Sequence, residues 1–328
     1  MGGDFGPRVA VRGALEALDR HPQLNIVLVG DERAISEQLP SNAARYGSRL
    51  LVEHAESVIA MDEKPSSALR NKRDSSLWQA IELVNSGGAS GCVSAGNTGA
   101  LMAVGRYLLK THGGIDRPAM VTAMPTQSGH CYLLDIGANV DSNSHHLLQF
   151  AVMGSVLAES VDGTQSPRVG LLNIGHEDIK GNEQVKQANM VLAQQPNLNY
   201  IGYVEADAVY SGVADVVVCD GFVGNVLLKA SEGTASLIAS RIRSIFTSSW
   251  YFKFVGLMGL PLVNQLRKQM DPGRYNGATF LGLAGVLVKS HGNVTPRSFR
   301  YAIERAMYES ENNLPERICK GLDDAILE

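Results

Sequence analysis

The chain has 328 residues, of which 45% are hydrophobic and 19% charged, and its formal net charge is −4. This composition excludes a disordered chain, and the lack of an overall basic charge argues against a nucleic-acid-binding surface. No apolar run approaches the ~20 residues that span a bilayer, and no secretory apolar stretch is visible near residue 1. The four cysteines are scattered singly, which is typical of buried thiols in a reducing compartment. We therefore expect a cytoplasmic protein that at most rests on a membrane surface.

Short apolar runs rich in Val, Ile and Leu alternate with helix-like segments along most of the chain. The predicted strands are 26–30, 50–54, 91–96, 119–125, 131–137, 169–175, 200–206 and 215–221. The predicted helices are 66–86, 98–110, 145–160, 181–194 and 223–246. Several strands are apolar on both faces, so the alternation predicts an α/β protein whose mostly parallel sheet is wrapped by helices. No linker divides the chain, so we expect a single catalytic domain over residues 1–328.

The segment that follows the last of these helices breaks the pattern. Trp250, Tyr251, Phe252 and Phe254 cluster there, although only 6% of the chain is aromatic. We expect residues 241–272 to form a protruding helical insert with a hydrophobic and basic surface. Two interpretations stay open: a helical hairpin buried in a dimer core, or a tip that lies in the lipid interface. The residues expected to contact an anionic membrane or an acidic partner are Arg241, Arg243, Trp250, Lys253, Leu257, Leu260, Arg267 and Lys268.

Four predicted strands end in polar turns that pair Gly with Asn. The turns are SAGNTG at 94–99, LDIGANVD at 134–141, LNIGHEDIKGNE at 172–183 and CDGFVGN at 219–225. In open α/β sheets ligands bind outside the carboxyl ends of the strands, so we expect the turns to meet in one crevice. Backbone N–H groups and amides in such turns suit an anion, although any single turn could be a plain helix cap.

Several common chemistries are excluded by missing motifs. The sequence has no G-x-G and no Gly-Lys pair, which excludes the dinucleotide fingerprint and the Walker A loop, and it has no GxSxG, HExxH or EF-hand motif. The adjacent residues His176, Glu177 and Asp178 cannot easily converge on one ion, so we expect no metal and no cofactor.

An anion site remains as the candidate, and phosphate is an anion that suits it. Lys180 and Lys289 each follow an apolar segment and precede a Gly-bearing turn, so we expect them to face the crevice, although lone lysines are more often solvated.

Together these segments resemble the PlsX family of phosphate acyltransferases, which make acyl-phosphate from acyl-[acyl carrier protein] and inorganic phosphate. The matching stretches, from residue 1 to 292, are MGGDFGP, SAGNTGALM, LLDIGANVD, LLNIGHEDIKGNE, DVVVCDGFVGNVLLK and YNGATFLGLAGVLVKSHG. The resemblance implies a three-layer α/β/α sandwich similar to the phosphotransacetylase and isopropylmalate dehydrogenase folds. It also implies a homodimer, peripheral membrane association and acyl carrier protein as the partner that meets the basic insert.

Two positions depart from the family. Relatives carry a strand ending in Asp before the MGGD turn, whereas this chain begins at the Met of that motif, and His176 stands where relatives often carry an acid. We therefore assign no role to Gly2, Gly3, Asp4 or His176.

The residues and the resemblance predict the same reaction. Phosphate attacks the thioester carbonyl and the phosphopantetheine thiolate leaves, so no enzyme nucleophile is needed, and acyl groups pass to phospholipid synthesis. The predicted catalytic residues are Lys180, Asp220, Asn225, Lys289 and His291. The predicted contacts to phosphate and thioester are Ser94, Gly96, Asn97, Thr98, Gly99, Gly137, Asn139, Asn173, Gly175, Asn182, Gly221, Gly224 and Asn276. Two alternatives stay open: a phosphotransacetylase-like enzyme using acyl-CoA, and a non-catalytic phosphate- or nucleotide-binding regulator.

Overall fold

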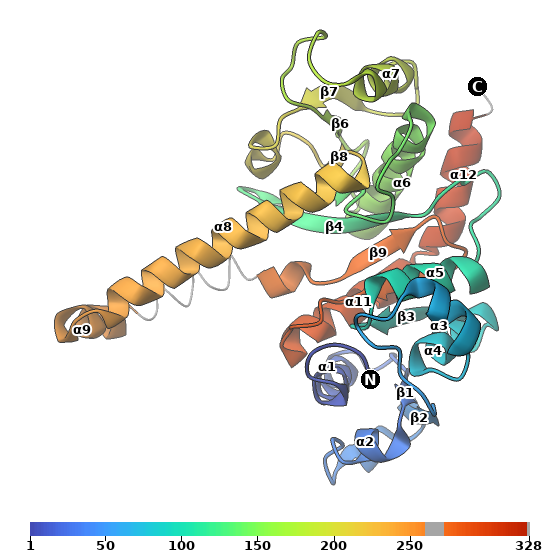
Figure 1. Cartoon of the computed structure of the whole chain (residues 1–328), viewed down its shortest axis with the longest axis vertical. Helices are drawn as coiled ribbons and strands as arrows, with labels where there is room; N and C mark the ends of the chain where they lie inside the picture. The colour runs from blue at the N-terminus through green and yellow to red at the C-terminus, as the bar shows by residue number, and fades with distance from the viewer. Residues whose placement is uncertain (260–271, 327–328) are drawn as a thin grey trace.

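The computed structural model describes residues 1–259 and 272–326, and its centre is an eight-stranded sheet (Figure 1). The strand order is β3-β10-β9-β4-β5-β8-β6-β7, and β1 and β2 form a separate parallel pair. The strands are β1 (Ile26–Gly30), β2 (Leu50–His54), β3 (Gly91–Ser94), β4 (Ala119–Thr126), β5 (Gly129–Leu134), β6 (Val169–Leu172), β7 (Tyr200–Val204), β8 (Val216–Val218), β9 (Ala278–Leu281) and β10 (Val286–Lys289).

Helices pack on both faces of this sheet and give three layers, so the predicted α/β/α fold is confirmed. One face carries α6 (Ser144–Asp162), α7 (Glu183–Leu192), α11 (Pro296–Glu311) and α12 (Leu314–Ile326). The other carries α3 (Pro65–Asn71), α4 (Ser76–Asn85), α5 (Thr98–Leu108) and the first turns of α8 (Gly221–Thr247). α1 (Pro7–Arg20) packs on α11, and α2 (Glu32–Ser36) lies beside β1 and β2. The short 3-10 helices are η1 (Ala43–Arg49), η2 (Ala208–Ser211) and η3 (Pro272–Tyr275).

The sheet is mixed, and this changes where the polar turns lie. β9 is antiparallel to both neighbours, and β4 is antiparallel to β5. β3, β10 and β4 therefore run one way, while β5, β6 and β8 run the other way. The carboxyl ends of β3 and β10 therefore lie at the opposite end of the strands from those of β5, β6 and β8. The expectation that all four glycine-bearing turns lie at the same end of the sheet is wrong, because the sequence does not show the antiparallel pairings.

The predicted helix over 66–86 is two helices. Ser75 is the N-cap of α4: its hydroxyl donates to the Lys72 carbonyl and accepts from the Trp78 N–H at 3.3 Å. A side chain that satisfies the free N–H groups of a helix start fixes the boundary there. α1, α11, α12, β9 and β10 are further elements that the sequence prediction did not assign.

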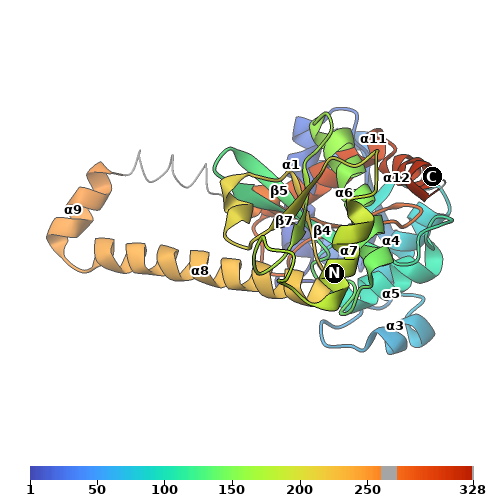
Figure 2. The ribbon, with the colours of Figure 1, turned by 90° about the horizontal axis from the view of Figure 1, so that it is seen from above.

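The helix α8 leaves the body of the protein as a long arm with α9 (Trp250–Met258) at its far end (Figure 2). Its 27 residues span roughly 40 Å. The expected insert boundary at residue 241 falls inside this continuous helix. Large apolar side chains along it are exposed, among them Leu237, Ile238, Ile242 and Ile245. None of the helices described is long and apolar enough to cross a membrane.

Candidate active site

The turn after β5 is built around the buried carboxylate of Asp135. Its oxygens accept from the backbone N–H groups of Met120, Gly137, Ala138 and Asn139 and from Nδ2 of Asn139, at 2.6 to 3.2 Å. Burial raises the pKa of Asp135, and these donors oppose that rise. Asp135 was not among the predicted site residues. Its position directly after the apolar run of β5 was a sequence signal that could have identified it. It positions the loop that carries the predicted contacts Gly137 and Asn139.

Two glycines let the first turn of α8 pack directly on this loop. A Cβ at Gly224 would overlap the carbonyl oxygen of Asp135 and would lie 2.9 Å from Sγ of Cys219. A Cβ at Gly221 would overlap the carbonyl oxygen of Asn139. Only a residue without a side chain fits either position. The glycines of CDGFVGN therefore serve helix-to-loop packing as well as any ligand.

The start of α8 is bonded to the same loop, because the Gly221 N–H donates to the Asn139 carbonyl at 2.9 Å. Asp220 caps the helix by accepting from the Val223 N–H at 3.0 Å. Asn225 is exposed and lies next to Gly137, whose φ of 125° favours glycine. A helix N-terminus with a neighbouring amide suits an oxyanion.

The turn after β6 holds Lys180 at the surface. Asn173 is buried with its amide 3.5 Å from the Lys180 carbonyl, and Asn182 caps α7 by accepting from the Val185 N–H at 2.9 Å. The Lys180 side chain packs over Gly175 and is exposed, and no ion pair to it is found among the described residues. Its predicted role as the positive charge at phosphate stays a prediction.

In the turn after β3, the side-chain amide of Asn97 makes its hydrogen bonds within the protein. Its Oδ1 accepts from the Ala100 N–H at 3.0 Å as the cap of α5, and its Nδ2 donates to the carbonyls of Ala60 and Glu63 at 3.1 and 2.8 Å. Ser94 Oγ accepts from the Gly96 N–H at 3.1 Å. These bonds assign Asn97 and Ser94 a positioning role in the turn. Thr98 is exposed and Gly99 half-buried, so they and the backbone remain the groups open to a ligand.

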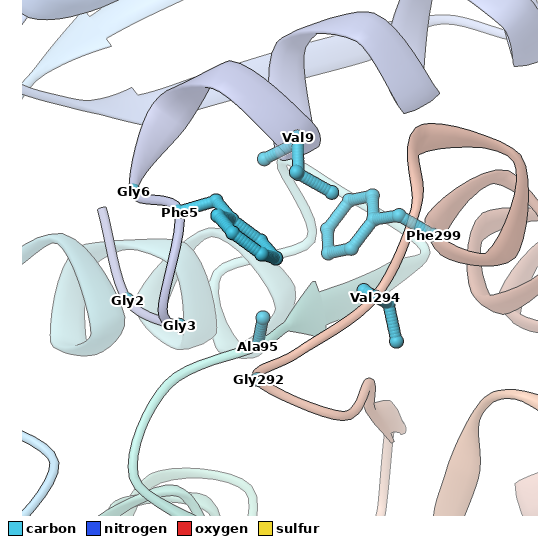
Figure 3. A pocket seen from close by; sticks show the side chains of 10 residues that line it. Gly2, Gly3, Phe5, Gly6, Val9, Ala95, Gly292, Val294 and Phe299 are labelled. Carbon is cyan, nitrogen blue, oxygen red and sulfur yellow. The ribbon is translucent and has the colours of Figure 1, made fainter. Parts of the chain in front are cut away.

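The first residues of the chain pack against the turns after β3 and β10. A Cβ at Gly2 would overlap Gly96, and the N–H of Asp4 donates to the Gly292 carbonyl at 3.1 Å. Figure 3 shows Phe5, Val9 and Phe299 pointing into the small pocket beside this turn. No charged side chain lines the pocket, so it offers nothing to hold phosphate.

Charged side chains from three separate segments meet at the end of β10. Lys289 is only 8% exposed, and its Nζ donates to the Ser290 carbonyl. Burial and the positive charge of Lys229 on α8 lower the pKa of Lys289 to about 8, and Asp4 partly opposes this. Lys229 donates to Glu232 at 2.8 Å, and the other oxygen of Glu232 lies 3.7 Å from Nε2 of His291.

The histidine of this cluster is held by a buried amide. Asn276 accepts from the His291 N–H at 3.1 Å, while its Nδ2 donates to Ser290 Oγ at 2.9 Å and to the Ser298 carbonyl at 2.8 Å. Burial lowers the pKa of His291, Lys229 and Lys289 lower it further, and Glu232 opposes them. Asn276 is therefore a positioning residue for the turn rather than a free ligand contact.

The helix α8 connects the two groups of predicted residues. At its start it packs on the Asp135 loop, and two to three turns later Lys229 and Glu232 reach the Lys289 and His291 turn. The structure thus joins Lys289 and His291 to α8, whereas Lys180 lies on the separate turn after β6. The sequence analysis left Asp4 unassigned because of the departure from the family at the MGGD turn, and it did not single out Glu232, because nothing local in the chain signals the partners of that residue.

The predicted partner-binding residues are only partly described. Arg241 and Arg243 are exposed on α8, and Trp250 at the start of α9 is 81% exposed. The side chains of Lys253 and Leu257, and the whole of Leu260, Arg267 and Lys268, lie outside the described residues. Among residues 1–259 and 272–326, no group of three or more His, Cys, Asp or Glu side chains could hold a metal ion.

The fold defines the structural class. A phosphotransacetylase from Streptococcus pyogenes superposes with a TM-score of 0.61 at 16% identity, covering 93% of this chain and 92% of that one. A branched-chain phosphotransacylase from Enterococcus faecalis V583 gives 0.57 at 16% identity, covering 94% and 97%. At this identity the likeness shows the fold alone, which is that of the phosphotransacetylases.

Sequence similarity gives the family. Residues 1–317 match the family described as "Fatty acid synthesis protein". The phosphate acyltransferase of Pseudomonas syringae pv. syringae (strain B728a) is 58% identical over 323 residues, 98% of this chain and 95% of that protein. That of Ectopseudomonas mendocina (strain ymp) is 54% identical over 327 residues, 100% and 97%. The chain belongs to the PlsX family of phosphate acyltransferases; it is an acyltransferase, and the family resemblance is confirmed.

Proposed function

We propose that the chain transfers a long-chain acyl group from acyl-[acyl carrier protein] to inorganic phosphate, and that the acyl-phosphate supplies phosphatidic acid synthesis. The observation that carries this proposal is the convergence of two lysines, Lys229 and Lys289, where α8 passes the end of β10. The charge of Lys229 disfavours the ammonium form of Lys289, and a bound oxyanion would relieve this repulsion; phosphate has the charge and the acceptors to contact both side chains.

In the proposed reaction, bound phosphate attacks the thioester carbonyl and the pantetheine sulfur leaves. Phosphate is itself the nucleophile, so the protein must orient it and stabilise the oxyanion of the tetrahedral intermediate. Donors for that oxyanion come from Asn225 at the start of α8 and from the turn after β10, which Lys229 and Glu232 of α8 reach. Lys180 supplies further positive charge from the turn after β6.

The arm formed by α8 and α9 has a surface that suits two kinds of binding partner. Residues 233–259 contain no Asp or Glu, while Arg241, Arg243 and Lys253 lie among apolar residues. A basic and apolar surface of this kind attracts anionic lipid and the acidic acyl carrier protein. The chain is proposed to bind the acyl carrier protein beside the arm and to rest the α9 tip on the cytoplasmic face of the membrane.

The exposed apolar residues of α8 suit pairing with a second copy of the chain in a homodimer. Light scattering coupled to size-exclusion chromatography would detect this dimer.

Trapping with hydroxylamine tests the proposed activity. Long-chain acyl-[acyl carrier protein] with phosphate should give acyl-hydroxamate, and the yield should depend on phosphate. Acetyl-CoA in place of the carrier substrate distinguishes a phosphotransacetylase, because only that alternative predicts faster reaction with the small acyl donor. No hydroxamate from either donor would indicate a non-catalytic binding protein and would contradict the proposal.

A further inference from the structure

Attack of phosphate on a thioester moves one proton from oxygen to sulfur. HPO₄²⁻ and the thioester become the acyl-phosphate dianion and a free thiol, so a C–O bond forms as the C–S bond breaks. The departing thiolate needs a proton, and the phosphate group gains acidity once it is acylated and gives one up. A group that holds a proton at neutral pH and releases it readily can carry it between the two atoms.

Other titratable groups near the end of β10 are less suited to carry this proton. Lys229 is exposed and already donates to Glu232 at 2.8 Å, and Glu232 lies 3.7 Å from His291. His291 has a lowered pKa, so it is largely neutral imidazole at pH 7. The buried cysteines are also unsuitable: burial raises the pKa of Cys92 and of Cys131 to about 12.

Lys289 differs from these groups in its position. It is the last residue of β10, its side chain is buried, and its Nζ is fixed on the Ser290 carbonyl. Lys229 and Glu232 from α8, Asp4 from the first turn and His291 from its own turn are the charged and titratable groups acting around it. The ammonium thus lies where α8 meets the turn after β10, and within residues 1–259 and 272–326 the Ser290 carbonyl is the hydrogen-bond partner found for it.

We propose that Lys289 donates a proton to the departing sulfur and that the resulting amine takes the proton released by the acylated phosphate. This assignment rests on the proposed function. The cycle balances without a further reactant, because the proton lost by phosphate replaces the one given to sulfur. Lys229 is a positioning residue here, since its charge disfavours the ammonium form of Lys289 and so eases the transfer.

The protonation of Lys289 sets an expected pH dependence. The ammonium is the donor, and its pKa is about 8, so kcat/KM should fall as the pH rises through about 8. In a Lys289→Arg variant the guanidinium keeps its proton across this range, so this alkaline decline should be lost.

The test compares two small thioesters that share one acyl chain. One is an N-acetylcysteamine ester, with an alkyl thiol as leaving group, and the other is a thiophenol ester, whose more acidic thiol leaves without protonation. Lys289→Arg and Lys289→Gln should lower kcat/KM about 10²-fold more on the first ester than on the second, because a lost phosphate contact would affect both esters equally. Lys320→Arg, an exposed lysine on α12, is the matched control and should behave as the wild type on both.

The outcomes separate the two proposals. Equal losses on the two esters in a folded Lys289→Arg variant would give Lys289 a structural or phosphate-binding role and overturn the proton-transfer assignment. An unchanged alkaline decline in that variant would overturn it as well. If the wild-type protein forms no acyl-phosphate from acyl-[acyl carrier protein] or either ester, the proposed function itself is wrong.

Discussion

His291 and Glu232 face one another across the site, with Nε2 of the histidine 3.7 Å from Oε1 of the glutamate. The histidine belongs to the turn after β10 and the glutamate to α8, which continues outward as the arm. One helix therefore carries a contact to the Asp135 loop at its start, a charged contact to the turn after β10 two to three turns later, and the surface proposed to bind partners at its far end.

The first prediction concerns the effect of Glu232 on the histidine. A nearby carboxylate favours the imidazolium form, so Glu232→Gln should lower the pKa of His291 further. NMR titration of the imidazole signals measures this change. Glu183→Gln is the control, because it breaks a Lys–Glu pair of the same i,i+3 spacing on α7. An unchanged His291 titration in the Glu232 variant would show that the pair does not interact in solution.

A second prediction contrasts two glycines of α8. Gly224→Ala should destabilise the protein by about 1–3 kcal/mol, because the added methyl overlaps the Asp135 carbonyl and forces the helix start away from its loop. Gly233→Ala places a methyl where no atom lies within 4 Å and should stabilise the helix by about 0.5–1 kcal/mol. Urea unfolding distinguishes them. Equal stability of the two variants would contradict the close packing of α8 on the Asp135 loop.

The third prediction concerns the tip of the arm. Trp250→Glu and Phe254→Glu should each weaken binding to vesicles rich in anionic lipid about 10- to 10²-fold, because burying a large aromatic side chain contributes about 1.5–3 kcal/mol. Vesicle flotation gives the bound fraction. Tyr107→Glu on α5 changes an aromatic residue on the body that is as exposed as Phe254, and it serves as control. If the tip variants bind as well as the Tyr107 variant, the tip is not the membrane anchor.

The fourth prediction concerns Lys180, which is exposed on the turn after β6. Lys180→Ala should lower kcat/KM by ~10²-fold, which is typical of losing one charged or oxyanion contact, and should leave the thermal unfolding midpoint unchanged. Lys186→Ala on the neighbouring helix α7 provides the comparison under identical assay conditions. Normal turnover in the Lys180 variant would remove this residue from the site.

The sequence predicts much of the fold because most strands are short apolar runs with polar glycine turns after them. Val216–Val218 and Val169–Leu172 are apolar at every position, and the structure buries each of them completely. The pairing direction could not be predicted. β9 and β10 lie within one apolar segment, and β9 pairs with β4, which is distant in sequence. The antiparallel pairing of β4 with β5 reverses the direction of half of the sheet, and an apolar run does not show its own direction.

The site was predictable only where residue type and turn position coincide. Asp220 and Asn97 are recognisable from the sequence as polar residues at helix starts, and both cap their helices. Asp135 follows an apolar run, and four of its five donors come from residues 137–139, so its role had a local signal that the prediction did not use. Glu232 meets His291 from a segment distant in sequence, which leaves no local pattern, so its role required the structure.

Attack of phosphate oxygen on the thioester carbon is tested most directly with phosphate labelled by ¹⁸O at all four oxygens. The wild-type protein is incubated with long-chain acyl-[acyl carrier protein] and labelled phosphate, and the products are measured by mass spectrometry together with the free carrier thiol. We predict acyl-phosphate that retains all four labels and forms one-to-one with the thiol. Thiol release with only free fatty acid as the acyl product, or no thiol release at all, would contradict acyl transfer to phosphate.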